Sequence, residues 1–182
     1  MTKEIETERR FLLKKLPKDL EMFSYEIIED LMLKTNEPHP HIRLRRRGNN
    51  FLLVKKYPKD SDDSLDYLQM VEETIVLNEI EFNILKKNDY TKQEKRRFKY
   101  PFNGWNTEID VWMGELKGLA KLEIEFKNKD LAQKFKMPDF CLKDITNEEW
   151  LSGGMLSGKK YKDIKKRLEG LNYSPITLSD LG

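Results

Sequence analysis

The feature that most constrains the fold is a stretch near the start of the chain in which charged residues alternate with others. Over residues 4–13, the two-residue period of a strand places on one face Glu4, Glu6, Glu8 and Arg10. The opposite face then carries Ile5, Phe11 and Leu13. A solvent-facing strand usually mixes charge signs, whereas three carboxylates side by side repel one another. This face therefore requires counter-charges or a metal ion from elsewhere in the chain.

The rest of the chain is typical of a series of strands, most of them joined by short turns. Beyond the opening strand, we expect strands at residues 24–34, 42–45, 51–57, 66–77, 91–100, 107–113 and 120–127. Loops are expected at residues 35–40, which contain two prolines, and at the aspartate-rich residues 58–66. Helices are expected after residue 16, after the capping residues Asn78 and Asn128, and within residues 145–151 and 160–171. About eight strands with few intervening helices favour an α+β fold, an antiparallel sheet that is curled or closed with helices packed outside.

Length and charge limit the number of domains and the class of partner. A chain of 182 residues is most economically one domain, residues 1–171, followed by a polar C-terminal tail at residues 172–182. The 34 basic residues nearly balance the 32 acidic ones, so a net charge of +2 gives no broad attraction to nucleic acid or membranes. The apolar runs are far shorter than a membrane span, and the first residues lack the apolar segment of a signal peptide. The one cysteine, Cys141, excludes an internal disulfide, and we expect a cytoplasmic protein with a buried, reduced thiol.

Sorting the strands by face segregates the charges by sign. The acidic pairs spaced i, i+2 are Glu6/Glu8, Glu108/Asp110 and Glu123/Glu125, and the basic positions are Arg43/Arg45, Lys95/Arg97 and either Lys55 or Lys56. In an ordinary half-solvated sheet the charged faces meet water, and for any single strand this interpretation stays open. If the sheet closes with its charge inside, those charges must be paired or metal-bound. Arginine and lysine suit phosphates, and carboxylates without His or Cys suit Mg²⁺ or Mn²⁺, so the closed alternative predicts a polyanion held together with a metal.

Five short motifs follow one another along these strands. They are Glu6-Thr7-Glu8-Arg9-Arg10 before Phe11-Leu12, Arg43-Leu44-Arg45 followed by a hairpin lysine, Lys95-Arg96-Arg97, Glu108-Ile109-Asp110, and Glu123-Ile124-Glu125-Phe126. In this order they resemble the CYTH superfamily, also called triphosphate tunnel metalloenzymes, from about Glu4 to Tyr161. The resemblance implies an eight-stranded antiparallel closed β-barrel, a tunnel that binds a linear triphosphate and a divalent metal and acts on the terminal phosphoryl group. Arg10 stands where the family usually has lysine, which keeps the charge but not the geometry.

The resemblance also implies roles for individual residues. The ligands of Mg²⁺ or Mn²⁺ would be Glu6, Glu8, Glu72, Asp110, Glu123 and Glu125, although Glu72 is the one in-phase carboxylate of its strand. The small anionic triphosphate would be bound by Arg10, Arg43, Arg45, Lys55 or Lys56, Lys95, Arg97 and, in a loose alignment, Lys160 or Lys162. The catalytic residues would be Glu6, Glu8, Asp110 and Lys95, which support in-line attack of a metal-positioned water on the outer phosphorus.

Within this resemblance the substrate stays open. Inorganic tripolyphosphate is the leading substrate, but an RNA 5′-triphosphatase, a thiamine triphosphatase or an adenylate cyclase would use the same tunnel. A non-catalytic polyphosphate- or nucleotide-binding module is the alternative from another class. An RNA 5′ end and a second copy of the chain are further candidate partners. A nucleic-acid-binding patch at residues 43–47 is a less favoured alternative. No membrane partner is expected.

Two other signals do not support a site of their own. Residues 153–159 match the Gly-x4-Gly-Lys part of a phosphate-binding P-loop, but Lys160 stands in place of its Ser or Thr, and the chain beyond is too short for a nucleotide-binding α/β domain. We expect a flexible turn or a tunnel lid there. His39 and His41 flank a proline and are expected to be exposed loop residues rather than metal ligands.

Overall fold

The computed structural model describes residues 1–34, 41–59 and 67–181. Its strands are β1 (Thr2–Leu13), β2 (Tyr25–Leu33), β3 (His41–Arg47), β4 (Asn50–Pro58), β5 (Gln69–Leu77), β6 (Tyr90–Phe102), β7 (Trp105–Trp112), β8 (Ala120–Phe126) and β9 (Cys141–Asp144). Its α-helices are α1 (Glu79–Leu85), α2 (Lys129–Lys134), α3 (Gly153–Leu156) and α4 (Tyr161–Glu169). Short 3-10 turns lie at η1 (Leu20–Met22), η2 (Gly114–Leu116), η3 (Glu149–Leu151) and η4 (Leu178–Leu181).

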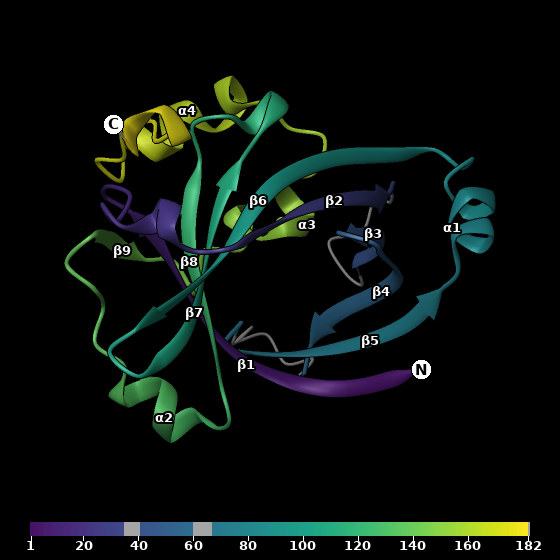
Figure 1. The fold of residues 1–182 in the computed structure, drawn as a ribbon, viewed down its shortest axis with the longest axis horizontal. Helices are drawn as coiled ribbons and strands as arrows, with labels where there is room; N and C mark the ends of the chain where they lie inside the picture. The colour runs from purple at the N-terminus through teal and green to yellow at the C-terminus, as the bar shows by residue number, and fades with distance from the viewer. Residues whose placement is uncertain (35–40, 60–66, 182) are drawn as a thin grey trace.

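The strands β1 to β8 close into a barrel (Figure 1). Their order around the barrel is β5-β4-β3-β2-β6-β7-β8-β1, and β1 closes the ring by pairing with β5. Residues 2–7 of β1 pair with β5, and residues 7–12 pair with β8. Every pairing is antiparallel. The prediction of an eight-stranded antiparallel closed barrel is confirmed.

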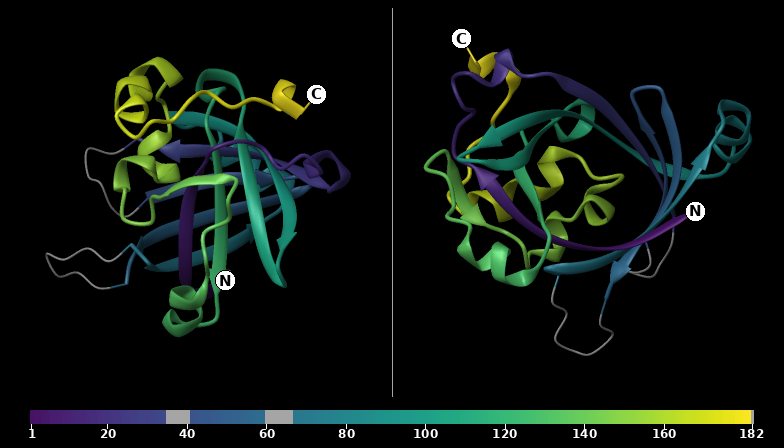
Figure 2. Two further views of the ribbon diagram at one scale, coloured as in Figure 1. Left: turned by 90° about the vertical axis from the view of Figure 1, so that its left-hand side faces the viewer. Right: turned by 60° about the horizontal axis from the view of Figure 1, so that its bottom comes forward.

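The closed sheet turns its charged face inward and its apolar face outward. On β8, Glu123 and Glu125 line the interior cavity, whereas Leu122 and Ile124 belong to the main hydrophobic core. That core lies between the outside of the barrel and the segments packed on it, among them α2 and α4 (Figure 2). A smaller core at α1 packs Phe82 with two outward residues of β2 and β3. An ordinary sheet with its charged faces in water is therefore excluded.

Local signals place several helix starts and turns. Asn78 caps α1 as predicted, because its side chain accepts from the Glu81 N–H at 2.9 Å while the Glu81 carboxylate accepts from the Asn78 N–H at 2.8 Å. Asn128 caps α2 by accepting from the Leu131 N–H at 3.0 Å. Gly48 has a φ of 57° in the turn between β3 and β4, a conformation that glycine adopts without strain. The predicted hairpin around this turn is confirmed.

The C-terminal region is more ordered than the sequence predicts. β9 pairs with the second half of β1, although no strand is expected there because a four-residue segment carries little periodicity. In place of a free tail, residues 172–181 pack against the barrel. The buried Tyr173 hydroxyl accepts from the Ala120 N–H at 2.8 Å and donates to the Gly118 carbonyl at 2.9 Å, and Ile176 forms a β-bridge to Gly118.

Two expected loops fall largely outside the described residues, namely residues 35–40 and most of residues 58–66. In the part of the chain that the structure describes, no helix combines the length and the apolar character that a membrane crossing requires.

Candidate functional site

The barrel interior holds a cavity of about 330 Å³ whose wall is dominated by charged side chains. The carboxylates at its surface are Glu4, Glu6, Glu8, Asp30, Glu72, Glu108, Glu123 and Glu125. The cations at its surface are Arg10, Arg43, Arg45, Arg47, Lys56, Lys95 and Arg97. Most of the carboxylates lie on β1, β7 and β8, and most of the cations lie on β3 and β6, so the two signs occupy different parts of the wall.

Three carboxylates form a cluster that suits a metal ion. Glu6 and Glu8 alternate along β1, and Glu125 stands opposite Glu8 in the register between β1 and β8. One oxygen from each of the three lies within 4.8 Å of the others. Burial together with the charges of Glu6 and Glu8 raises the pKa of Glu125 to about 7. The crowded carboxylates therefore favour a bound cation, and an all-oxygen set of this kind suits a hard divalent ion.

Lys56 joins the carboxylate cluster to the basic side of the cavity. Its Nζ lies 2.5 Å from Glu6 Oε2 and 3.3 Å from Glu8 Oε2. Burial opposes its charge, but Glu8 and Glu6 outweigh burial and raise the pKa of Lys56. The lysine stays protonated at the metal-side edge of the cavity.

Two arginines of β3 form the opposite wall with an acidic residue of β2. Arg45 donates two hydrogen bonds to Asp30, at 2.7 and 3.0 Å, and Arg43 Nη2 donates to Glu72 Oε2 at 3.1 Å. Burial would raise the pKa of Asp30, but Arg45 and Arg43 hold that pKa well below its usual range. Asp30 is therefore ionised and orients the two guanidinium groups.

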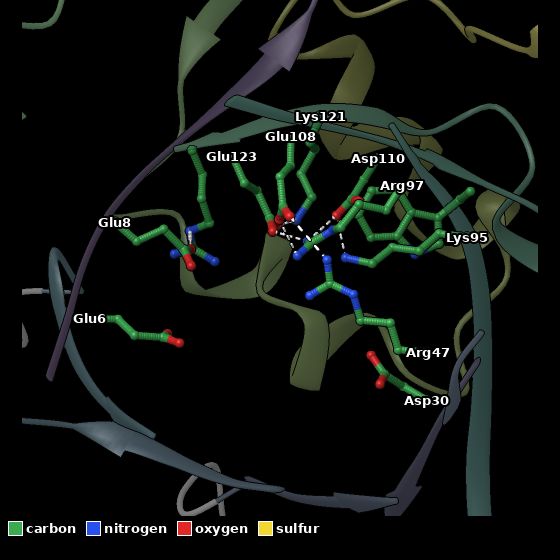
Figure 3. A network of polar contacts seen from close by, with 12 residues as sticks. Glu6, Glu8, Asp30, Arg47, Lys95, Arg97, Glu108, Asp110, Lys121 and Glu123 are labelled. Atoms are coloured by element: carbon green, nitrogen blue, oxygen red, sulfur yellow. Dashed lines mark hydrogen bonds and ion pairs between the residues drawn. The ribbon is translucent and has the colours of Figure 1, made fainter. Parts of the chain in front are cut away.

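A denser network surrounds Asp110 on β7 (Figure 3). Asp110 has no exposed surface and accepts from Lys95 Nζ and, at 2.7 Å each, from Nε and Nη2 of Arg97. Arg97 also contacts Glu123 through Nη2 and Glu108 through Nη1, the latter at 2.5 Å. Burial opposes ionisation of Glu123, but Lys95 and Arg97 hold its pKa well below the usual range. The carboxylates fix the positions of two cavity cations.

Two buried guanidinium nitrogens at the cavity have no hydrogen-bond partner among the described residues. They are the Nε atoms of Arg10 and Arg43. Arg10 uses Nη2 to donate to the Thr146 carbonyl at 2.6 Å, and its Nε lies 3.4 Å from Glu8 Oε1 without hydrogen-bond geometry. A buried donor without a partner is destabilising. The cavity is therefore suited to an anion that accepts hydrogen bonds.

The structure brings most of the predicted residues to the cavity and separates a few from it. Lys56 lines the cavity, which decides between the two hairpin lysines, since Lys55 points outward with its Nζ 3.7 Å from Glu73. Lys160 is likewise outside, because it precedes α4 with an exposed side chain 3.1 Å from Glu115. Lys162 is exposed on α4. The structure therefore places Lys55, Lys160 and Lys162 outside the lining of the cavity.

Three predicted metal ligands have cationic neighbours in the structure and are not part of the carboxylate cluster. Asp110 contacts both Lys95 and Arg97, Glu123 contacts Arg97, and Glu72 contacts Arg43. The compact group consists of Glu6, Glu8 and Glu125. The other three carboxylates lie instead beside arginine or lysine side chains.

Several cavity residues are not predicted from the sequence. Arg47 lies in phase with Arg43 and Arg45, so the two-residue period could have found it, whereas no inward position is predicted for the strand that carries Asp30. His41 is expected to be an exposed loop residue, but it begins β3, is buried and lines the cavity. His39 lies outside the described residues. Gly153 and Gly154 of α3 also line the cavity, and they belong to the segment for which a flexible turn or a tunnel lid is expected.

Comparisons with known proteins agree with this arrangement. No family model matches the chain. A curated protein named inorganic triphosphatase from Acetivibrio thermocellus is 33% identical over 73 residues, which cover 40% of this chain and 46% of that protein, so this match spans about half of its length. A second curated inorganic triphosphatase, from Nitrosomonas europaea, is 29% identical over 147 residues, which cover 79% of this chain and 91% of that protein.

Solved structures show the same fold. The crystal structure of the inorganic triphosphatase NE1496 matches with a TM-score of 0.57 and 23% identity, over 85% of this chain and 95% of that one. The crystal structure of a putative adenylate cyclase from Bacillus halodurans matches with a TM-score of 0.56 and 14% identity, over 91% of this chain and 98% of that one. The chain therefore shares the closed-barrel fold of these structures, and its sequence is similar to curated proteins named inorganic triphosphatase.

Proposed function

We propose that this protein is a divalent-metal-dependent triphosphatase that removes the terminal phosphate from a linear triphosphate, with inorganic tripolyphosphate as its substrate. The observation that carries the proposal is the cavity itself, in which buried arginines with unused donors face a cluster of carboxylates. Anion binding alone gains nothing from that cluster, so its presence favours catalysis over a simple polyphosphate-binding module. Curated relatives named inorganic triphosphatase support the same activity.

Glu6, Glu8 and Glu125 are the residues that would hold Mg²⁺ or Mn²⁺. Their fit rests on carboxylate oxygens that lie within 4.8 Å of one another and on the raised pKa of Glu125, which reflects burial and the nearby charges of Glu6 and Glu8. A bound divalent ion would supply Lewis-acid stabilisation of phosphoryl oxygens and a more acidic water. Both ions accept oxygen ligands in octahedral geometry, so the donor set suits either one.

The basic residues bind and orient the phosphate chain. Arg43, Arg45 and Arg10 present guanidinium forks, which match the geometry of phosphate oxygens, and Lys56 and Lys95 provide point charges. Arg97 completes the basic wall on β6. Their carboxylate partners keep these side chains aligned, and phosphate oxygens then accept from the donors that remain free. Because these positions are fixed before substrate binds, little reorganisation is required as charge develops on the leaving pyrophosphate.

Asp110 acts in this proposal as a positioning residue. It touches Lys95 and Arg97 and has no exposed surface, so it orients both cations toward the cavity. In the reaction, a bond forms between the water oxygen and the terminal phosphorus while the bridging P–O bond breaks, which yields orthophosphate and pyrophosphate.

The experiment that tests the proposal is hydrolysis of three substrates by the full chain. Tripolyphosphate, ATP and RNA with a 5′-triphosphate are each incubated with Mg²⁺, with Mn²⁺ and with a chelator, and all phosphate products are identified. We expect orthophosphate and pyrophosphate from tripolyphosphate, dependent on the metal. Binding without turnover under every condition would support the non-catalytic alternative, and pyrophosphate with a cyclic nucleotide from ATP would support a cyclase.

A further inference from the structure

The backbone of residues 151–154 lies across one end of the barrel. Ser152, Gly153 and Gly154 contribute to the wall of the cavity, although they come from α3 and the residue before it rather than from a strand. Figure 1 shows α3 within the outline of the strands, while α1, α2 and α4 lie outside it. α3 therefore contributes backbone to the cavity wall.

Gln93 holds this backbone from inside the barrel. Its Nε2 donates to the Gly153 carbonyl at 2.6 Å, and its Oε1 accepts from the Trp112 indole N–H at 3.0 Å. Gln93 is 5% exposed and Trp112 is 2% exposed. The indole thus fixes the orientation of the amide, and the amide fixes Gly153.

Lys121 holds the same backbone two residues earlier. Its Nζ donates to the Leu151 carbonyl at 2.9 Å, and the lysine is 1% exposed. The Trp112 ring lies between two ammonium groups, 4.7 Å from Lys121 Nζ and 5.0 Å from Lys95 Nζ. A buried lysine without a full counter-charge is unfavourable unless its donors are used, so the contact with Leu151 compensates its burial. Gln93 and Lys121 anchor the two sides of one short segment.

The segment fits closely against the barrel wall. A Cβ added to Gly154 would collide with the imidazole of His41, the first residue of β3, so a side chain here would displace that ring. A Cβ added to Gly153 would lie 3.6 Å from Gln93 Nε2 and 4.0 Å from Arg43 Nη1. Gly153 therefore lies beside a cation of the proposed phosphate site with little space between them.

Exposure of the charged lining increases away from this segment. Near it, the side chains of Arg10 and Lys95 are 8% and 7% exposed, whereas those of Arg47 and Glu108 are 31% and 28% exposed. Glu4 and Glu125, which also line the cavity, are exposed as whole residues, although the carboxylate end of Glu125 is partly buried beside Glu6 and Glu8. The barrel is thus open where these four residues lie, and carboxylates predominate among them.

From these contacts we propose that residues 151–154, held by the positioning residues Gln93 and Lys121, form the end wall of the tunnel and set the longest phosphate chain that binds fully inside it. This inference rests on the proposed triphosphatase function and adds a specificity determinant to it. A linear triphosphate reaches the inner cations and stops at Gly153. A longer chain must leave its extra phosphates at the open end, where they meet Glu4 and Glu108, and like charges repel.

The test compares tripolyphosphate with tetrapolyphosphate in the wild type, in Gln93→Ala and in Lys121→Met. We expect the wild type to prefer tripolyphosphate by about tenfold or more in kcat/KM. Gln93→Ala frees the Gly153 carbonyl and removes side-chain volume, so the preference should fall about threefold or more, through a lower KM for tetrapolyphosphate. Lys121→Met releases the Leu151 carbonyl and should shift the preference in the same direction.

Gln69→Ala is the matched control. Gln69 lies on β5 away from the lining of the cavity and donates to Thr7 Oγ1 at 3.1 Å, so its loss should leave the length preference unchanged. Melting temperatures of all variants report whether each one folds, and Lys121→Met provides the comparison if Gln93→Ala does not fold.

Two results would overturn the inference while the proposed function stands. One is a wild type that hydrolyses both chains equally well, and the other is an unchanged length preference in both folded wall variants. Failure of the proposed function is a different result, namely no turnover of either chain. Calorimetric binding of the two polyphosphates then still reports the length preference, and equal affinities in wild type and both wall variants would overturn the end wall as well.

Discussion

The ammonium of Lys56 on β4 lies 2.5 Å from a carboxylate oxygen of Glu6 on β1, although β5 lies between these strands in the barrel. The contact crosses the interior rather than following the sheet. It joins the proposed metal cluster to the proposed phosphate site, and it is the shortest described link between them that a substrate phosphate could interrupt. Predictions for the site begin from this pair.

Replacement of Lys56 by alanine should reduce kcat/KM for tripolyphosphate by roughly 100-fold, because a buried charge that contacts both Glu6 and the substrate is removed. Its neighbour Lys55 provides a matched control, since it points outward toward Glu73. Lys55→Ala should change kcat/KM less than about twofold, because exposed ion pairs contribute little. Steady-state phosphate release measures kcat/KM for both variants. Equal losses of kcat/KM in the two variants would contradict a role for Lys56 in binding the substrate.

Glu125 should make the metal-free protein less stable as the pH rises from about 4.5 to about 7. Burial and the carboxylates of Glu6 and Glu8 raise its pKa from 4.5 to about 7, so within this window the folded state holds a proton that the unfolded state has released. The stabilisation from this proton is complete at pH values below the pKa of Glu125 in the unfolded state. It is lost as the pH rises through the pKa of Glu125 in the folded state. Glu125→Gln should therefore flatten the fall in melting temperature between pH 4.5 and 7 by a few degrees.

Thermal unfolding in the presence of a chelator measures this effect. Glu79→Gln on the exposed first turn of α1 is the control, and its melting profile should follow the wild type. A Glu125→Gln profile parallel to the wild type across the whole window would contradict the assignment of a crowded carboxylate at this position.

Asp110→Asn should destabilise the protein by about 3 kcal/mol or more, because it leaves the buried charges of Lys95 and Arg97 without their shared partner. Chemical denaturation measures the free energy of unfolding. Asp130→Asn, on the exposed first turn of α2, should change it by less than about 0.5 kcal/mol. A stable Asp110→Asn protein that had lost metal affinity would instead favour the metal-ligand role implied by the family resemblance.

Arg10→Lys should raise the KM for tripolyphosphate by roughly tenfold. Lysine cannot donate to the Thr146 carbonyl while presenting a second nitrogen to the cavity, as the guanidinium of Arg10 does. Arg46→Lys on the outer face of β3 is the control and should leave KM unchanged. An unchanged KM in Arg10→Lys would mean that charge alone matters at this position, as in family members that carry lysine there.

The two-residue period of strands predicts a curled or closed antiparallel sheet and the residues that share each face, and the family resemblance implies the closed tunnel. Glu123 and Leu122 are assigned to opposite faces by that period alone, and the structure agrees. The period does not determine which carboxylates bind a base and which gather for a metal. Asp110 meets Arg97 through the pairing of β6 with β7, and such a pairing depends on register, which no single strand contains.

Other parts of the site depend on contacts that local patterns do not carry. Lys55 and Lys56 are adjacent, so one residue of uncertainty in the turn exchanges the inward lysine for the outward one. Gly153 reaches the cavity because Gln93 and Lys121, far away in sequence, bind the backbone around it. His41 is buried through the close approach of Gly154, which a reading of the proline-rich loop before it could not predict.

The double pairing of β1 has a consequence for how the molecule forms. Its first strand finds one neighbour at residues 69–74 and the other only at residues 121–126. During synthesis the N-terminal segment therefore cannot pair with β8 until nearly 130 residues have been made. Its row of glutamates stays hydrated until then. Contacts so distant along the chain slow folding, so we expect closure of the barrel to be a late step. The glutamates of β1, which repel one another in an open intermediate, then become neighbours of arginine and lysine side chains.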